Sequence, residues 1–314
     1  MKKALITGIS GFAGGYLAAQ LLKNDNYELV GTYTSAKSHD NLDSKIKLVQ
    51  VNLQEEKSVS DLITSEKPDY IFHLAALASP KNSFDNPTET FTNNILMQIN
   101  VLEAVRKFLP SVKLLTISSA EVYGKVAEED LPIDEETPFN PTNPYAVSKL
   151  AQDYITYQYY LSNKLDVVRV RPFNHIGPRQ SLSFVVAEFA KRIADIEKGK
   201  ENTMKVGNLK TKRDFTDVRD MVRAYEMAME KGEAGEVYNI GSGKCYLISD
   251  ILNKLISLSN KKIEVVEDAN LLRPNDNPEL LCDYSKFHKL TGWEPEIPIE
   301  KTLQDTLDYW RNQD

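Results

Sequence analysis

ITGISGFAGGYLA, residues 6–18, starts at the end of an apolar run and passes through glycines into a helical pattern. Gly8, Gly11 and Gly14 stand at GxxGxxG spacing. Glycines at such positions let the backbone turn tightly and approach a pyrophosphate, which then lies at the positive end of the following helix. In this strand-turn-helix setting the stretch predicts a dinucleotide site rather than a plain tight turn.

Apolar runs alternate with helical patterns through the first half of the chain. The runs that we predict to be strands are KALITG, YELVGTYT, IKLVQVNL, YIFHLAA, VKLLTISSA and LDVVRVRPF. Strands that alternate with helices pair in parallel through right-handed crossovers. We therefore expect an α/β protein with a doubly wound parallel Rossmann sheet.

The rhythm changes after residue 173, and a smaller α/β lobe is expected there. The strand pattern GEVYNIGSG, residues 235–243, is expected to return to the first sheet. The predicted Rossmann domain therefore comprises residues 1–172 plus about 214–245. Residues 173–213 plus about 246–314 would form an interleaved substrate domain.

Composition limits the kinds of partner. The net charge is −7 and lysines and arginines form no long run, which argues against a nucleic-acid partner. No apolar run reaches the roughly 18 to 20 residues of a membrane helix, so we expect no membrane partner and a cytoplasmic protein. Cys245 and Cys282 have no metal-ligand spacing around them, so free thiols and no metal site are expected.

The end of the second predicted strand, GTYTSAKS at residues 31–38, bears on the cofactor. An acidic residue there would bind the adenosine ribose 2′-hydroxyl, while an arginine would favour a 2′-phosphate. Thr34, Ser35 and Lys37 could contact either, so both NAD(H) and NADP(H) stay open. The absence of a guanidinium favours NAD(H).

The pentapeptide YAVSK, residues 145–149, carries a candidate acid and base. Tyr145 and Lys149 are four residues apart, which places them on one face of a helix. A free tyrosine has a pKa near 10. Lowering this pKa by roughly 3 units, about 4 kcal/mol, would let Tyr145 act as an acid or base near neutral pH. A neighbouring lysine and an oxidised nicotinamide ring act in that direction. Tyrosines follow on the same helix, so packing is the alternative, but the glycine loop upstream favours chemistry.

TGISGFAG (7–14), HLAA (73–76), SSAEVYG (118–124) and YAVSK together resemble the extended short-chain dehydrogenase/reductases, which act on nucleotide sugars. The resemblance spans nearly the whole chain. It implies that Ser119 hydrogen-bonds the reacting oxygen and that Asn94 supports the catalytic lysine. The cofactor contacts that it implies are Gly8, Gly11, Phe12, Gly14, Thr34, Ser35, Asn52, Leu53, Ala75, Ala76, Asn94, Tyr145 and Lys149.

Glu121 follows Ser119 by two residues. In the sugar-nucleotide 4,6-dehydratases a glutamate at this position removes the C5 proton after C4 oxidation, whereas epimerases usually lack it. Ala120 departs from the dehydratases, which carry aspartate or serine there. Glu121 is therefore a candidate catalytic base, with a solvated surface charge as the alternative.

The second half narrows the resemblance. RPFNHIGPRQ, VGNLKTKRDFTDVRDMVRAY and LRPNDNPELL resemble the branch that holds GDP-mannose 4,6-dehydratases and GDP-4-keto-6-deoxy-D-mannose reductases, the reductases most of all. A diphosphate on a protein of net charge −7 needs dedicated cations. The substrate contacts that the resemblance implies are Arg213 and Arg273 on the diphosphate, Asp276 on the ribose, Asn174 on the diphosphate or sugar, Lys191 near the nucleotide, and Ser79 and Ser83 at the hexose. His175 is expected to pack within its loop.

These motifs together predict a nucleotide-sugar oxidoreductase that transfers hydride at C4 of a GDP-linked mannose-type sugar. Tyr145 would donate the proton, Ser119 would polarise the oxygen and Lys149 would hold the tyrosine. The reverse reaction, a C4 dehydrogenase, stays open. The alternatives are a GDP-mannose 4,6-dehydratase that uses Glu121 and a non-enzymatic redox-sensing Rossmann protein. The helices around 87–107 and 143–162 resemble those that pair into a four-helix interface, so a homodimer is expected.

Overall fold

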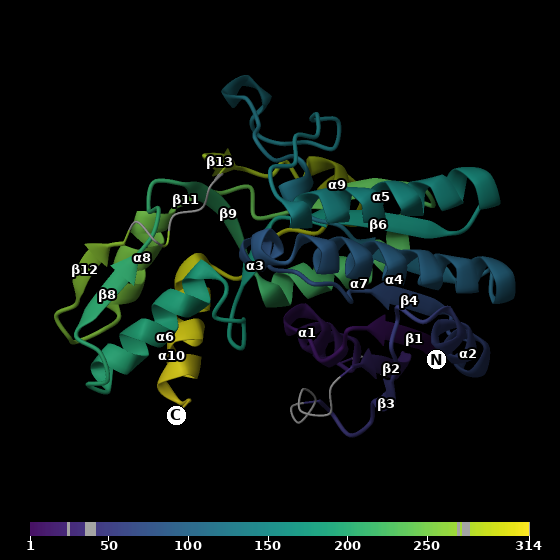
Figure 1. Ribbon diagram of the computed structural model, residues 1–314, viewed down its shortest axis with the longest axis horizontal. Coiled ribbons are helices and arrows are strands. Elements are labelled where there is room, and N and C mark those ends of the chain that lie inside the picture. The colour runs from purple at the N-terminus through teal and green to yellow at the C-terminus, as the bar shows by residue number, and fades with distance from the viewer. Residues whose placement is uncertain (24–25, 35–41, 269–270, 272–276, 314) are drawn as a thin grey trace.

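The computed structural model describes residues 1–23, 26–34, 42–268, 271 and 277–313. A large parallel sheet with helices on both faces occupies one side of the molecule, and shorter strands and helices form a second lobe (Figure 1). The second lobe lies beside the edge of the sheet at which the strands end. Ser35, Lys37, Arg273 and Asp276 lie outside the described residues.

In the described part of the chain, one seven-stranded sheet has the order β10-β6-β5-β4-β1-β2-β3, and each neighbouring pair is parallel. Its strands are β1 (Lys2–Thr7), β2 (Tyr27–Tyr33), β3 (Lys47–Gln50), β4 (Tyr70–His73), β5 (Lys113–Ile117), β6 (Val167–Pro172) and β10 (Val237–Ile240). The predicted fold class is confirmed. The late strand β10 pairs with β6, as the pattern at 235–243 indicated.

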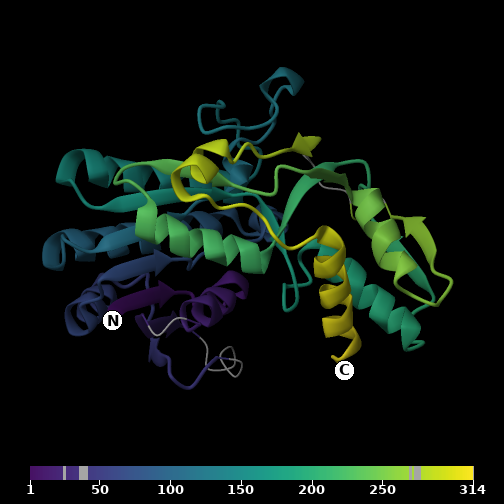
Figure 2. The ribbon, with the colours of Figure 1, turned by 180° about the vertical axis from the view of Figure 1, so that it is seen from behind.

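Helices cover both faces of this sheet (Figures 1 and 2). One face carries α1 (Phe12–Leu21), α7 (Val218–Lys231) and α9 (Ser285–Thr291), and the other carries α2 (Glu56–Glu66), α4 (Pro87–Phe108) and α5 (Pro144–Asn163). Alternate side chains of β1 point to opposite faces of the sheet. Ala4 and Ile6 pack on the α1 side, and Leu5 packs on the α2 side. Because both faces are buried, the strands read as continuous apolar runs in the sequence.

The second lobe has its own core. Its strands are β7 (Asn174–Ile176), β8 (Thr203–Val206), β9 (Lys212–Asp217), β11 (Cys245–Leu247), β12 (Glu264–Glu267) and β13 (Glu279–Leu280). Strands β7, β9, β11 and β13 form one small sheet, and β8 pairs with β12. Helices α6 (Val185–Glu197), α8 (Ile248–Ser257) and α10 (Ile299–Arg311) pack together through side chains such as Phe189, Leu252 and Leu303.

Buried carboxylates tie the two lobes together at the start of α7. Asp217 accepts a hydrogen bond of 2.7 Å from the Thr302 hydroxyl of α10. Asp220 accepts from the backbone N–H groups of Glu296 and Ile297 at 2.9 and 2.8 Å. Because both carboxylates are almost fully buried, these bonds hold α10 and the segment before it against the Rossmann layer.

The described residues show neither a membrane span nor a metal site. In that part of the chain no helix is long and apolar enough to cross a membrane. The same residues contain no cluster of histidine, cysteine and carboxylate side chains suited to a metal ion. Cys245 and Cys282 are free thiols.

Candidate active site

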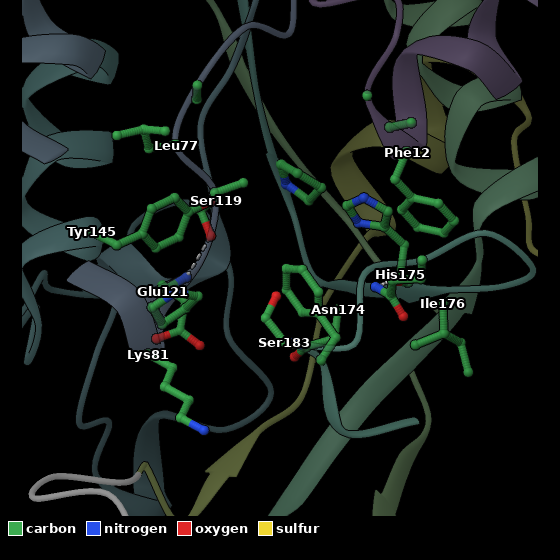
Figure 3. A pocket seen from close by; sticks show the side chains of 18 of the residues that line it. Phe12, Leu77, Lys81, Ser119, Glu121, Tyr145, Asn174, His175, Ile176 and Ser183 are labelled. Atoms are coloured by element: carbon green, nitrogen blue, oxygen red, sulfur yellow. Dashed lines mark hydrogen bonds between the residues drawn. The ribbon is translucent and has the colours of Figure 1, made fainter. Parts of the chain in front are cut away.

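A cavity of about 740 Å³ runs between the two lobes. The glycine loop and the ends of β4, β5 and β6 line one part of it, and residues of the second lobe such as Gly207 and Arg213 line another. Figure 3 shows Ser119, Glu121 and Tyr145 on one side of the cavity, facing Phe12, Asn174 and His175 on the other. Ligands of α/β sheets bind at this edge, outside the carboxyl ends of the strands.

The glycine loop allows a close approach of backbone to ligand. Gly8 has φ +69°, a conformation that other residues rarely adopt, and a Cβ there would lie 2.9 Å from Ala75 Cα. A Cβ on Gly14 would lie 2.3 Å from the carbonyl oxygen of Gly8. Gly8 and Gly14 therefore have no room for side chains, and the backbone at the start of α1 can approach an anion such as a pyrophosphate.

The predicted cofactor residues divide between the cavity and its surroundings. Those that line it are Gly8, Gly11, Phe12, Gly14, Thr34, Leu53, Ala75, Ala76, Tyr145 and Lys149. Asn52 and Asn94 are not among the described residues that line the cavity. Asn52 Nδ2 instead donates to Glu55 at 2.9 Å.

Tyr145 stands at the beginning of α5, where Asn143 caps the helix. Its side chain is 9% exposed, and burial raises the pKa of its phenol to about 12 although the hydrogen bond with Ser119 lowers it. Desolvation outweighs neighbouring charge in the protein by itself. The Tyr145 phenol is therefore protonated at neutral pH. The expected lowering of this pKa also needs an oxidised nicotinamide ring, and it stays a prediction.

Ser119 ends the β5 segment and caps a short 3-10 helix, η2 (Ala120–Val122). The backbone N–H of Glu121 donates to Ser119 Oγ at 3.2 Å, which fixes the hydroxyl next to Tyr145. The Glu121 carboxylate also lines the cavity and accepts a hydrogen bond of 3.2 Å from Asn143 Nδ2.

Lys149 lies one helical turn deeper than Tyr145 and is 4% exposed. Burial lowers the pKa of its ammonium group to about 7, against the opposing charge of Asp153. Lys149 Nζ donates to Gln152 Oε1 at 2.8 Å. Gln152 Nε2 in turn donates to Gln98 Oε1 on α4 at 3.3 Å, so a line of buried amides fixes the lysine.

Asn94, predicted to support Lys149, has other partners. Its side chain accepts from the backbone N–H of Leu77 at 2.8 Å and donates to the Leu77 carbonyl at 3.1 Å. It also donates to Ser148 Oγ at 2.9 Å. Asn94 therefore joins α4, α5 and the loop after β4, and Gln152 gives the lysine its direct support. Sequence reasoning missed Gln152, although it lies three residues after Lys149 and so on the same helix face.

The predicted substrate residues also divide. Asn174 and Arg213 line the cavity, and Arg213 Nη1 donates to the Asn277 carbonyl at 2.7 Å. Lys191 is paired with Asp195 on its own helix, and the described lining does not include it. Ser79 and Ser83 are also not among the described residues that line the cavity. Both belong to the start of α3 (Pro80–Asp85), where Ser79 Oγ caps the helix and Ser83 Oγ donates to the Pro80 carbonyl.

Some residues of the cavity were not anticipated. Lys81, Glu188 and Lys205 bring charges to the lining. His175, expected to pack within its loop, lines the cavity with its ring stacked on Phe12, at a centroid distance of 5.9 Å and an interplanar angle of 3°. These positions depend on the way the two lobes meet, which no local sequence pattern encodes.

The family sequence model described as GDP-mannose 4,6 dehydratase matches residues 5–306. The chain belongs to this family. GDP-6-deoxy-D-mannose reductase of Pseudomonas aeruginosa is 36% identical over 313 residues, which cover 99% of this chain and 98% of the relative. GDP-mannose 4,6-dehydratase of Yersinia enterocolitica is 30% identical over 352 residues, covering 98% of this chain and 93% of the relative.

Solved structures of related enzymes also resemble this chain over nearly its whole length. RMD from Pseudomonas aeruginosa in complex with NADPH has a TM-score of 0.86 and 35% identity, with 99% of both chains covered. UDP-glucose 4-epimerase of Thermus thermophilus with NAD has a TM-score of 0.89 and 29% identity, again with 99% of both chains covered. The comparisons confirm the predicted family, its Rossmann-type fold and a nicotinamide-dependent oxidoreductase. The two solved relatives carry different nicotinamide cofactors.

The low pKa of Lys149 predicts a measurable effect on stability. The pKa of Lys149 is about 7 in the folded protein and 10.5 for an ordinary solvated lysine. Burial of the charged lysine therefore lowers the free energy of unfolding by its full amount below pH 7. This loss of stability disappears as the pH rises to about 10.5. Lys149→Met should therefore raise the free energy of unfolding, by on the order of a few kcal/mol near pH 6 and by much less near pH 9.5. Denaturant unfolding across this range measures it. Lys57→Met, at an exposed site, is the control, and the absence of a gain near pH 6 would contradict the burial argument.

Proposed function

We propose that this protein reduces the C4 keto group of a GDP-linked 6-deoxy sugar of the mannose type. The observation that carries the proposal is the convergence of Tyr145, Ser119 and Lys149 in one cavity with the glycine loop. A relative that is 36% identical over nearly its whole length is named GDP-6-deoxy-D-mannose reductase. Reduced nicotinamide cofactors and nucleotide sugars are both cytoplasmic metabolites, so we place the enzyme in the cytoplasm.

The side chains divide the proton chemistry among them. A bound reduced cofactor supplies the hydride that forms the new C4–H bond. Ser119 Oγ donates a hydrogen bond to the C4 oxygen and stabilises the charge that develops there. Tyr145 gives its phenolic proton to that oxygen, which completes the alcohol. Lys149, held by Gln152, then stabilises the phenolate until the tyrosine is protonated again.

A reduction needs a protonated acid beside the C4 oxygen, and Tyr145, whose pKa burial raises to about 12, is protonated in the protein by itself. An ordinary tyrosine is also protonated at neutral pH, so the reductive direction rests on the relative that is named a reductase.

Arg213 is the cation that best supports a diphosphate substrate. Besides Lys149, the charged side chains among the described residues that line the cavity are the cations Lys81, Lys205 and Arg213 and the carboxylates Asp85, Glu121 and Glu188. Arg213 is nearly buried, at 8% exposure, so a phosphate beside it would meet a weakly hydrated guanidinium. Arg273 and Asp276 remain proposed contacts to the diphosphate and the GDP ribose. Asn174 remains a proposed contact to the diphosphate or the sugar.

Glu121 supports a second candidate, a GDP-mannose 4,6-dehydratase. Its carboxylate lines the cavity next to Ser119 and Tyr145 (Figure 3), where a base for the C5 proton would have to lie. Asn143 holds this carboxylate in place. Ala120, in contrast, offers no polar group to assist, and its side chain is buried.

One pair of reactions separates the two candidates. GDP-4-keto-6-deoxymannose should oxidise NADPH or NADH steadily, whereas GDP-mannose with NADP⁺ or NAD⁺ should give no product. Tyr145→Phe removes the proton donor and should lower turnover by about 10²- to 10⁴-fold while GDP binding stays within about twofold. A keto sugar formed from GDP-mannose without net use of cofactor would establish the dehydratase, and full activity of Tyr145→Phe would rule out the proposed acid.

We also propose that two copies associate through α4 and α5. Val147, Tyr154 and Leu161 are exposed by 41, 51 and 49%, and their spacing of seven residues places them in one stripe along α5. Helix α4 lies beside α5 on the same outer face of the molecule (Figure 1). An exposed apolar stripe along a helix is typical of a subunit interface.

A charge within this stripe should separate the subunits. The double variant Tyr154→Lys and Leu161→Lys should change the mass measured by light scattering from that of a dimer to 35.5 kDa. Leu182→Lys, at a 45% exposed leucine elsewhere, should leave the mass unchanged. A variant that remains a dimer would contradict this interface.

A further inference from the structure

Tyr225 of α7 is a buried phenol that the proposed chemistry does not use. Its side chain is 0% exposed, yet it lines the cavity. Its hydroxyl has no hydrogen-bond partner among the described residues. Buried tyrosine hydroxyls are normally bonded, because an unbonded one costs stability. A polar group left in this state in a cavity wall is suited to a ligand.

The position of α7 places this hydroxyl at the reactive end of the cavity. The helix begins at the strand ends, where Val218 Cγ1 would lie 2.9 Å from a Cβ on Gly177. Helical side chains tilt towards the N-terminus of their helix, so the phenol of Tyr225 extends towards that end. Burial raises the pKa of Tyr225, and the nearby Tyr145 raises it further. Both tyrosines line the same cavity.

The position of Tyr225 favours a contact with the dinucleotide rather than with the sugar substrate. Tyr225 packs in the same core cluster as the residues of α1 and contacts the layer that carries the glycine loop. The core of the second lobe is a separate cluster of side chains. Gln180, whose Oε1 is also unpartnered among the described residues, donates to the His175 carbonyl, and His175 stacks on Phe12.

We propose that the Tyr225 hydroxyl hydrogen-bonds the carboxamide of the nicotinamide ring and fixes the orientation of that ring beside Tyr145. A phenol can donate to the carboxamide oxygen or accept from its NH₂ group, so either orientation of the amide satisfies it. This makes Tyr225 a positioning residue for hydride transfer. The inference rests on the proposed function only for the presence of a nicotinamide ring, and not on the identity of the sugar.

Tyr225→Phe removes the hydroxyl and keeps the ring. The affinity of NADPH and NADH, measured by quenching of protein fluorescence without any sugar, should fall about tenfold, the effect of one lost hydrogen bond. ADP-ribose and its 2′-phosphate, which lack nicotinamide, should bind wild type and variant equally. Equal affinity of both proteins for NADPH and NADH would overturn the proposal. An equal loss for ADP-ribose would do so as well, because it would place the effect elsewhere.

Thermal unfolding without ligand provides a readout that is independent of binding. Tyr225→Phe should unfold at the same or a higher temperature, because it loses an unsatisfied polar group. The matched control is Tyr238→Phe: Tyr238 is 2% exposed, and its hydroxyl already accepts from the Glu233 N–H at 3.3 Å. This control should lower the midpoint and leave cofactor affinity unchanged. A lowered midpoint for Tyr225→Phe would indicate a structural hydroxyl and overturn the proposal. Neither measurement uses a sugar, so failure of the proposed reaction would be seen separately.

Discussion

The burial of Lys149 is the constraint on which the rest of the site depends. An ammonium group with 4% exposure needs partners, and helices α4 and α5 supply them. Gln152 and Gln98 form one line of support. The carboxylate of Asp153 supplies the other, because its negative charge favours the protonated lysine.

Asp153 in turn depends on two buried arginines. Arg169 Nη1 and Arg171 Nε donate to its carboxylate at 2.7 and 2.9 Å. Although burial raises the pKa of Asp153, Arg171 and Arg169 hold it below its usual value, so the carboxylate stays charged. Both arginines come from β6, the strand that leads into the second lobe. The charge balance of α5 thus depends on a strand of the sheet, β6, which lies next to the edge strand β10.

The features that the sequence could predict are those set by local rules. Glycine spacing, the alternation of strands with helices and the four-residue interval between Tyr145 and Lys149 each act within one element, and the structure has the fold that they indicate. Gln152 and Tyr225 escaped notice because their importance comes from what the folding brings beside them. Lys191, which is paired with Asp195 one turn away, stays a predicted contact near the nucleotide. Burial, which outweighs neighbouring charge at Tyr145 in the protein by itself, cannot be read from spacing.

The central claim is that hydride passes to C4 of the sugar while its C5 proton stays in place. The most direct measurement is one turnover of GDP-4-keto-6-deoxymannose in D₂O with ordinary NADPH, followed by NMR of the sugar. The account predicts protium from the cofactor at C4 and the original proton at C5. Deuterium at C4 or at C5 would contradict it.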